Sequence, residues 1–185
     1  MFQRVLSKIS KALGEASITY MVIGGQAVLQ YSEPRFTNDI DVTLGIGADQ
    51  TTKMLALAKA QGWRILVENP EAFIQETMVL PVEDTETHIR IDFIFSWTSY
   101  EQNAIARSSI IAGSESSDIH YATKEDIIIH KMLARRARDL EDIKNILLAN
   151  QTIDHAYIET CLKTFEVDLG ISILPEYLAL KKQIL

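Results

Sequence analysis

The residues best suited to chemistry in this chain are two aspartates separated by one apolar residue. Asp39 and Asp41 flank Ile40 at the start of an apolar run that extends to Ile46. Alternate residues of a β-strand share a face, so the two Cα atoms would lie roughly 6.6–7 Å apart with their carboxylates on the same side. Hard divalent cations prefer such oxygen ligands. The spacing therefore predicts a site for Mg²⁺ or Mn²⁺.

A third aspartate is a candidate ligand of the same predicted site. Residues 87–95 alternate, so that one face carries Ile89, Ile91, Phe93 and Phe95 and the other carries His88, Arg90 and Asp92. An aspartate beside core residues needs a partner, because burying an unpaired carboxylate is costly. On a strand next to the first pair, Asp92 would complete a two-metal site. Such sites activate an attacking oxygen with one metal and stabilise the leaving oxygen with the other.

A pair of glycines precedes the aspartates and suggests what they act on. Gly24 and Gly25 close the apolar run of residues 20–23, and Asp39 follows Gly25 by fourteen residues. Backbone amides of a glycine turn that opens a helix can approach phosphate oxygens closely, and the helix dipole favours the anion. Neither a Gly-Lys-Ser/Thr sequence nor a GxGxxG fingerprint is present. The pair predicts a triphosphate-binding turn of another kind.

The elements that must position these groups alternate between strands and helices up to about residue 122. The predicted strands are residues 19–23, 38–44, 63–67, 87–95, 108–112 and 118–122, and the predicted helices are residues 2–13, 26–31 and 49–61. Beyond residue 123 the pattern is helical, with further helices over residues 139–148, 154–165 and 175–182. We expect an α/β (α+β) core over residues 1–122, with a mixed sheet flanked by helices. A helical region over residues 123–185 would pack on it.

These motifs resemble a known superfamily. Val22-Ile-Gly-Gly25, Arg35-Phe-Thr37 and Asn38-Asp-Ile-Asp41, with the later Asp92, are similar to the signature of DNA polymerase β-like nucleotidyltransferases. That signature is a Gly-Gly or Gly-Ser turn, a short helix and an Asp-x-Asp/Glu strand. A narrower resemblance is to the AbiEii-type toxin nucleotidyltransferases. It is carried by Gly-Gly-Gln-Ala-Val at residues 24–28, Pro-Arg-Phe-Thr-Asn-Asp-Ile-Asp-Val at residues 34–42, and the segment Lys131 to Ile143. The resemblance covers about residues 18–148.

The resemblance implies a role for each matching residue. It places Gly24 and Gly25 at the triphosphate, Asp39 and Asp41 on both metals, and Asp92 on the catalytic metal, where it also helps to activate the acceptor hydroxyl. Two cations would contact the nucleotide, namely Lys131 and Arg35. The alternatives are a solvated helix lysine at position 131 and a surface arginine at position 35. Arg138 and Asp139 would either serve the site or simply pair and cap the following helix.

The implied activity is transfer of NMP from an NTP such as ATP to a hydroxyl group, with release of pyrophosphate. Acceptors within the resemblance are the tRNA 3′ end, protein hydroxyls and small molecules such as antibiotics, and a cognate antitoxin protein is an expected partner. Two alternatives stay open. One is a non-catalytic toxin–antitoxin interaction protein on the same core, and the other is a small Asp-x-Asp glycosyltransferase.

Composition narrows the remaining classes. Of 185 residues, 47% are hydrophobic and 23% charged, as in ordinary globular proteins, and the net charge is −7. A broad nucleic-acid binder would be basic, so any RNA contact should rest on a local patch, for which residues 131–138 are the candidates. No apolar run approaches the roughly 20 residues that span a bilayer. A cytoplasmic protein is therefore expected.

Overall fold

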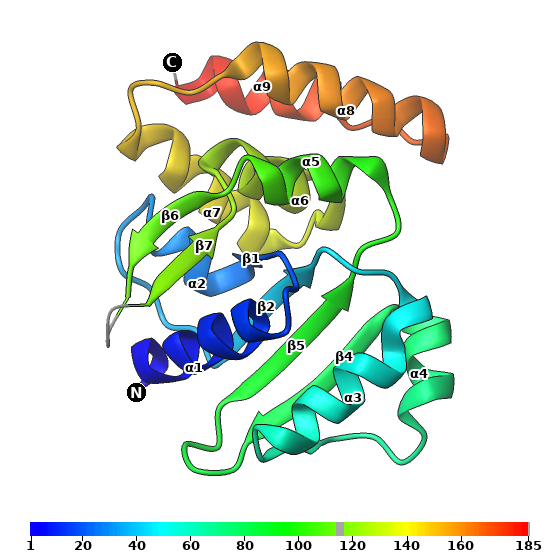
Figure 1. Cartoon of the computed structure of the whole chain (residues 1–185). Helices are drawn as coiled ribbons and strands as arrows, with labels where there is room; N and C mark the ends of the chain where they lie inside the picture. Colours follow the sequence, from blue (N-terminus) through cyan, green and yellow to red (C-terminus); the bar gives the residue numbers. More distant parts are fainter. Residues whose placement is uncertain (114–116, 185) are drawn as a thin grey trace. The chain divides into compact units, whose positions relative to one another are not determined.

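The strands of the described residues belong to one mixed sheet (Figure 1). The computed structural model describes residues 1–113 and 117–184, and within them seven strands pair in the order β3-β4-β5-β2-β1-β7-β6. These strands are β1 (Tyr20–Ile23), β2 (Asp39–Leu44), β3 (Trp63–Ile65), β4 (Val79–Asp84), β5 (Arg90–Phe95), β6 (Ser109–Ala112) and β7 (Asp118–Tyr121). The pairs β2–β5 and β1–β7 are parallel and the other pairs are antiparallel. The predicted fold class is confirmed.

The helices divide between two compact units. The first unit comprises Met1–Gln26 and Phe36–Ala122, and the second comprises Ala27–Arg35 and Thr123–Leu185. Helices α1 (Phe2–Glu15), α3 (Thr51–Ala60), α4 (Pro70–Thr77) and α5 (Ser99–Ala106), with a 3-10 turn at Ala48–Gln50, belong to the first unit. Helices α6 (Lys124–Ala134), α7 (Ala137–Ala149), α8 (His155–Leu169) and α9 (Leu174–Ile184) belong to the second. The short α2 (Gly24–Val28) joins the two.

The core of the first unit explains why the central strands alternate. Ile40, Val42 and Leu44 of β2 are fully buried, and so are the alternate residues Ile91 and Phe93 of β5. The intervening residues Asp39, Asp41 and Asp92 are partly exposed. Apolar burial on one side thus holds both strands in a register that leaves their carboxylates on the other side.

The sequence patterns missed three elements of the first unit. Helix α4, strand β4 and helix α5 were not predicted, and β4 lies inside the sheet between β3 and β5. Its Pro81 obscured it, because proline lacks the N–H that a central strand normally donates. In the sheet, the Pro81 carbonyl oxygen instead accepts from the Leu66 N–H at 3.0 Å. Helix α5 begins with a capping box formed by Thr98 and Glu101.

The prediction for α2 was wrong at its start. The helix was expected to begin at Gln26, after a glycine turn, but it begins at Gly24 and ends at Val28. Gly24 has a φ of 60°, which a glycine adopts at no steric cost, so the turn from β1 into the helix occurs at this residue.

No helix in residues 1–113 and 117–184 is long and apolar enough to span a membrane.

Candidate active site

The parallel pairing of β2 with β5 brings the three predicted aspartates onto one face. Asp41 of β2 pairs with Asp92 of β5, and Asp39 pairs with Arg90. Paired residues of adjacent strands project to the same side of a sheet, so the three carboxylates and one guanidinium share a surface. Thr37 adds a hydroxyl, which donates to Asp39 Oδ1 at 3.2 Å.

Gly24 packs directly against this group. Strand β1 is antiparallel to β2 and pairs Ile23 with Asp41, so the next residue, Gly24, turns beside the Asp41 side chain. A Cβ atom built on Gly24 would collide with the Asp41 carboxylate. The glycine therefore has two local reasons to be there, its positive φ and the close carboxylate. The amides of the first helical turn begin at the same point.

Arg90 is a member of this group that the sequence analysis named only as a neighbour of Asp92. Its Nε donates to Asp92 Oδ1 at 2.9 Å, while the side chain stays 56% exposed. The pKa of Arg90 is raised above its ordinary value, chiefly because Asp92 accepts this hydrogen bond. The negative charges of Asp39 and Asp41 act in the same direction. Arg90 is thus the ion-pair partner of Asp92 and lies in the field of the other two carboxylates.

The oxygen atoms of Asp39, Asp41 and Asp92 are of the kind that a hard divalent cation prefers as ligands. Within residues 1–113 and 117–184, no three His, Cys, Asp or Glu side chains converge closely enough to hold a metal ion. Asp92 is engaged by Arg90, which uses one of the oxygens a cation would need. Asp39, Asp41 and Asp92 are nevertheless carboxylates on one face, two of them directly paired. A divalent cation held by all three would require the carboxylates to move closer together and Asp92 to release Arg90.

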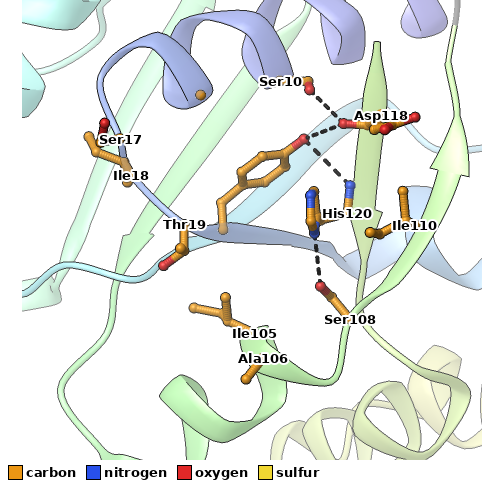
Figure 2. A pocket seen from close by; sticks show the side chains of 12 residues that line it. Ser10, Ser17, Ile18, Thr19, Ile105, Ala106, Ser108, Ile110, Asp118 and His120 are labelled. Carbon is orange, nitrogen blue, oxygen red and sulfur yellow. Dashed lines mark hydrogen bonds between the residues drawn. The ribbon is translucent and has the colours of Figure 1, made fainter.

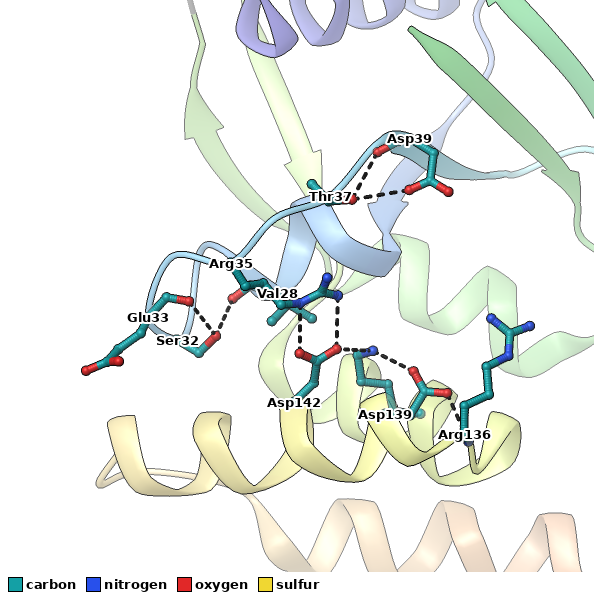
Figure 3. Close-up of polar contacts among 10 residues, drawn as sticks. Val28, Ser32, Glu33, Arg35, Thr37, Asp39, Arg136, Asp139 and Asp142 are labelled. Carbon is teal, nitrogen blue, oxygen red and sulfur yellow. Dashed lines mark hydrogen bonds and ion pairs between the residues drawn. The ribbon is translucent and has the colours of Figure 1, made fainter.

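The second unit places the two predicted cationic residues together (Figure 3). Arg35 Nε lies 2.8 Å from Asp142 Oδ1, and Arg35 Nη2 donates to Asp142 Oδ2 at 3.0 Å. Lys131 Nζ lies 2.6 Å from Asp142 Oδ2 and 2.8 Å from Asp139 Oδ1. Lys131 is only 7% exposed, and the Arg35 side chain is 21% exposed. The alternative of a solvated lysine was therefore wrong, while Arg35 is a partly exposed arginine in an ion pair.

This buried ion cluster, formed by Arg35, Lys131, Asp139 and Asp142, holds two cations and two carboxylates and is neutral overall. Asp139 also accepts from the Arg136 N–H at 3.2 Å in the first turn of α7. Asp139 therefore pairs and caps, as one of the two alternatives for it expected. Arg138 is exposed on the same helix.

The predicted basic patch at residues 131–138 is broken up by these contacts. Lys131 is buried and paired, and Arg135 donates to Glu176 Oε2 at 2.7 Å. Arg136 and Arg138 remain exposed around the start of α7. The segment is therefore not a continuous cationic surface of the kind that tracks a nucleic-acid backbone.

Replacing Gly24 by alanine tests the two reasons for a glycine at this position, its positive φ and the close Asp41 carboxylate. We expect the variant to lose about 1–3 kcal/mol from backbone strain and at least about 1 kcal/mol more from displacement of Asp41. Gly62→Ala is the matched control, since Gly62 also has a positive φ of 68° but its Cβ would have no neighbour closer than 3.9 Å. Denaturant unfolding measures both losses. Equal losses in the two variants would show that Asp41 moves aside freely.

Comparisons with known proteins identify the fold. No protein-family model matches the sequence, and no curated protein is significantly similar to it. Among solved structures, the antibiotic-resistance factor ANT(2'')-Ia is 16% identical, with a TM-score of 0.61 over 91% of this chain and 92% of that chain. An antigenic nucleotidyltransferase-like protein from Paracoccidioides brasiliensis is also 16% identical, with a TM-score of 0.59 over 97% and 91%.

A third solved structure has a lower TM-score. The lincosamide antibiotic adenylyltransferase LnuA, bound to lincomycin, is 19% identical and has a TM-score of 0.52 over 77% of this chain and 94% of that chain. The chain thus has the fold of nucleotidyltransferases, as the superfamily resemblance implies. These likenesses do not bear on the narrower resemblance to AbiEii-type toxins.

Proposed function

We propose that the protein is a metal-dependent nucleotidyltransferase that moves NMP from an NTP to an acceptor hydroxyl and releases pyrophosphate. The observation that carries this proposal is the pairing of Asp41 with Asp92 on adjacent parallel strands, with Asp39 on the same face. Gly24 turns against Asp41 at the same place. The fold shared with nucleotidyltransferases is consistent with this activity.

The proposal gives a task to the aspartates, the glycine pair and the arginine of the candidate active site. Asp39, Asp41 and Asp92 hold the divalent cations, which would neutralise charge on the phosphates and lower the pKa of the attacking hydroxyl. The amides after Gly24 and Gly25 orient the triphosphate. We also assign to Asp92, once it has released Arg90, the acceptance of the proton of the acceptor hydroxyl. Arg90 is then left with a free guanidinium beside the anionic substrate.

The roles of Arg35 and Lys131 at the triphosphate remain a prediction. Both side chains are held by Asp142, and Lys131 is held by Asp139 as well. A direct contact with phosphate would have to use the N–H donors that these carboxylates do not engage, or displace a carboxylate. The alternative within the same proposal is that the ion cluster keeps α6, α7 and the loop before Arg35 in place.

Two observations favour a small-molecule acceptor over tRNA or protein. ANT(2'')-Ia has been solved with adenylyl-2''-tobramycin and LnuA with lincomycin, so similar folds accommodate antibiotics. The dispersed basic residues at 131–138 offer little to an RNA backbone. We therefore propose a hydroxyl-bearing small molecule as acceptor. The AbiEii-type relationship, with a cognate antitoxin as partner, is the finer proposal that depends on sequence resemblance alone.

Label transfer from each α-³²P NTP tests the function. The purified protein is incubated with Mg²⁺ or Mn²⁺ and, separately, with a hydroxyl-bearing antibiotic panel, tRNA or a cell protein extract. We expect label in the small-molecule pool, and none with EDTA or in the Asp39→Ala variant. Label in tRNA or protein would keep the enzyme but change the acceptor.

Two other results would replace the proposal. Absence of label from every pool, with a stable antitoxin complex that survives Asp39→Ala, would favour the non-catalytic interaction protein. Turnover of a nucleotide sugar without pyrophosphate release would favour the glycosyltransferase.

A further inference from the structure

A cavity lies in the first unit, at the start of β1 (Figure 2). Its volume is about 570 Å³, and it is lined by residues of α1, β1, α5, β6 and β7 together with the loop before β1. Its lining includes the side chains of Ile18, Tyr20, Ile105, Ser108, Asp118 and His120. None of the three aspartates of the candidate active site lines it.

The cavity exists because β7 separates from β1 at this end. The two strands share a single bridging pair, Val22 with Tyr121. In the gap, the Tyr20 hydroxyl donates to the Asp118 carbonyl oxygen and accepts from the His120 N–H, both at 3.4 Å. Burial raises the pKa of Tyr20, so the hydroxyl keeps the proton that it donates. These bonds satisfy backbone groups that a continued ladder would have paired, and the strands stay apart.

The cavity is separate from the carboxylate site. Tyr20 pairs with Leu44 and Ile23 pairs with Asp41, so Tyr20 lies three residues along β1 from the level of Asp41, or about 10 Å. An odd spacing on a strand also reverses the face. Tyr20 therefore projects to the side of the sheet opposite to Asp41. A molecule bound beside Tyr20 would not lie at the phosphate being transferred.

The walls combine an apolar body with a few polar groups. Ile18, Ile105 and the Tyr20 ring supply apolar surface, and the His120 ring lies edge-on to Tyr20 with centroids 5.4 Å apart. His120 Nδ1 is 3.1 Å from Ser108 Oγ, so this imidazole is held in one orientation. Small-molecule sites typically have this composition and volumes of about 300–1,000 Å³.

The charge of the lining selects the ligand. Of the described residues that line the cavity, none is lysine or arginine, and Asp118, an exposed residue, is the one that carries a carboxylate. Hydroxyl groups of the wall can accept further hydrogen bonds. We propose that this cavity is a binding site for a small aromatic molecule that carries a protonated amine. The proposal does not depend on the transferase activity.

Three indole probes of similar size but different charge test the proposed site. Tryptamine, indole-3-ethanol and indole-3-acetate share the indole ring and end in a cation, a neutral hydroxyl and an anion. Titrations followed by the backbone amide resonances of Gly14, Ser108 and His120 measure their affinities. Tryptamine should bind about tenfold more tightly than indole-3-acetate, with shifts at all three amides. Equal affinities, or no shifts at these amides, would overturn the proposal.

Variants locate the binding. Asp118→Asn should remove most of the difference between tryptamine and indole-3-acetate and leave indole-3-ethanol unchanged. Ala106→Trp should abolish binding of all three probes, because Ala106 is an exposed residue of the lining that a large ring would obstruct. Ala56→Trp is the matched control, at an exposed alanine of α3 outside the lining. Tryptamine that still binds Ala106→Trp but is lost in Asp41→Asn would be bound at the catalytic carboxylates, contrary to the proposal.

Discussion

Replacing Asp41 by asparagine is expected to reduce nucleotidyl transfer by about 10³-fold or more while the protein stays folded. Asp41 is the central member of the carboxylate group, because it pairs with Asp92 across the strands and packs against Gly24. Asparagine keeps the shape and one oxygen but removes the charge that would hold a divalent cation in the proposed mechanism. Transfer rates measured over a range of Mg²⁺ concentrations should show both a lower maximum and a higher metal requirement.

The free energy of unfolding should change little. Asp41 is partly exposed, and removing its charge relieves repulsion with Asp39 and Asp92 but also removes its attraction to Arg90. Asp49→Asn serves as control, since Asp49 is an exposed aspartate of the same unit. Full activity in Asp41→Asn, with the metal requirement of the wild type, would refute the assignment of this residue to metal binding. A drop in activity matched by unfolding would leave only a structural role.

The strands that carry the aspartates were predictable because burial has a simple period. Ile40 and Val42 alternate with Asp39 and Asp41, and the same rule identified the strand of Asp92. Periodicity does not predict strand order. We expected β5 beside β2 only because a third carboxylate there would complete a two-metal site. Register depends on contacts between residues some fifty positions apart, and the two strands meet with Asp41 opposite Asp92.

What the sequence concealed depended on tertiary contacts. Strand β4 was missed because Pro81 is a poor strand residue, although the sheet accommodates it through its carbonyl oxygen. The strand pattern placed Arg90 on the same face as Asp92, but the ion pair between them and the position of Arg90 beside Asp39 depend on the folded structure and its register. Asp142 was not singled out at all. Its role arises because folding brings Arg35, 107 residues away in sequence, onto its side chain.

The largest stability effect should come from Lys131. Lys131→Met is expected to destabilise the second unit by about 3–5 kcal/mol, because removing one partner of a buried ion pair leaves its counter-ions uncompensated. Asp142 would keep Arg35, but Asp139 would lose its cation while only 9% exposed. Thermal and denaturant unfolding measure the loss. Lys144→Met is the control, since Lys144 is an exposed lysine on α7.

A second substitution distinguishes charge balance from lost packing. In Lys131→Met/Asp139→Asn, the remaining pair of Arg35 with Asp142 is neutral again, so the double variant should regain at least about half of the lost stability. Because it is folded, it also allows a clean test of the predicted contact between Lys131 and the triphosphate. Unchanged NTP affinity in the double variant would assign Lys131 to the ion cluster alone. A loss of about tenfold or more would support a contact between Lys131 and the bound nucleotide. A stability loss below about 1 kcal/mol in Lys131→Met would instead contradict the burial of this charge.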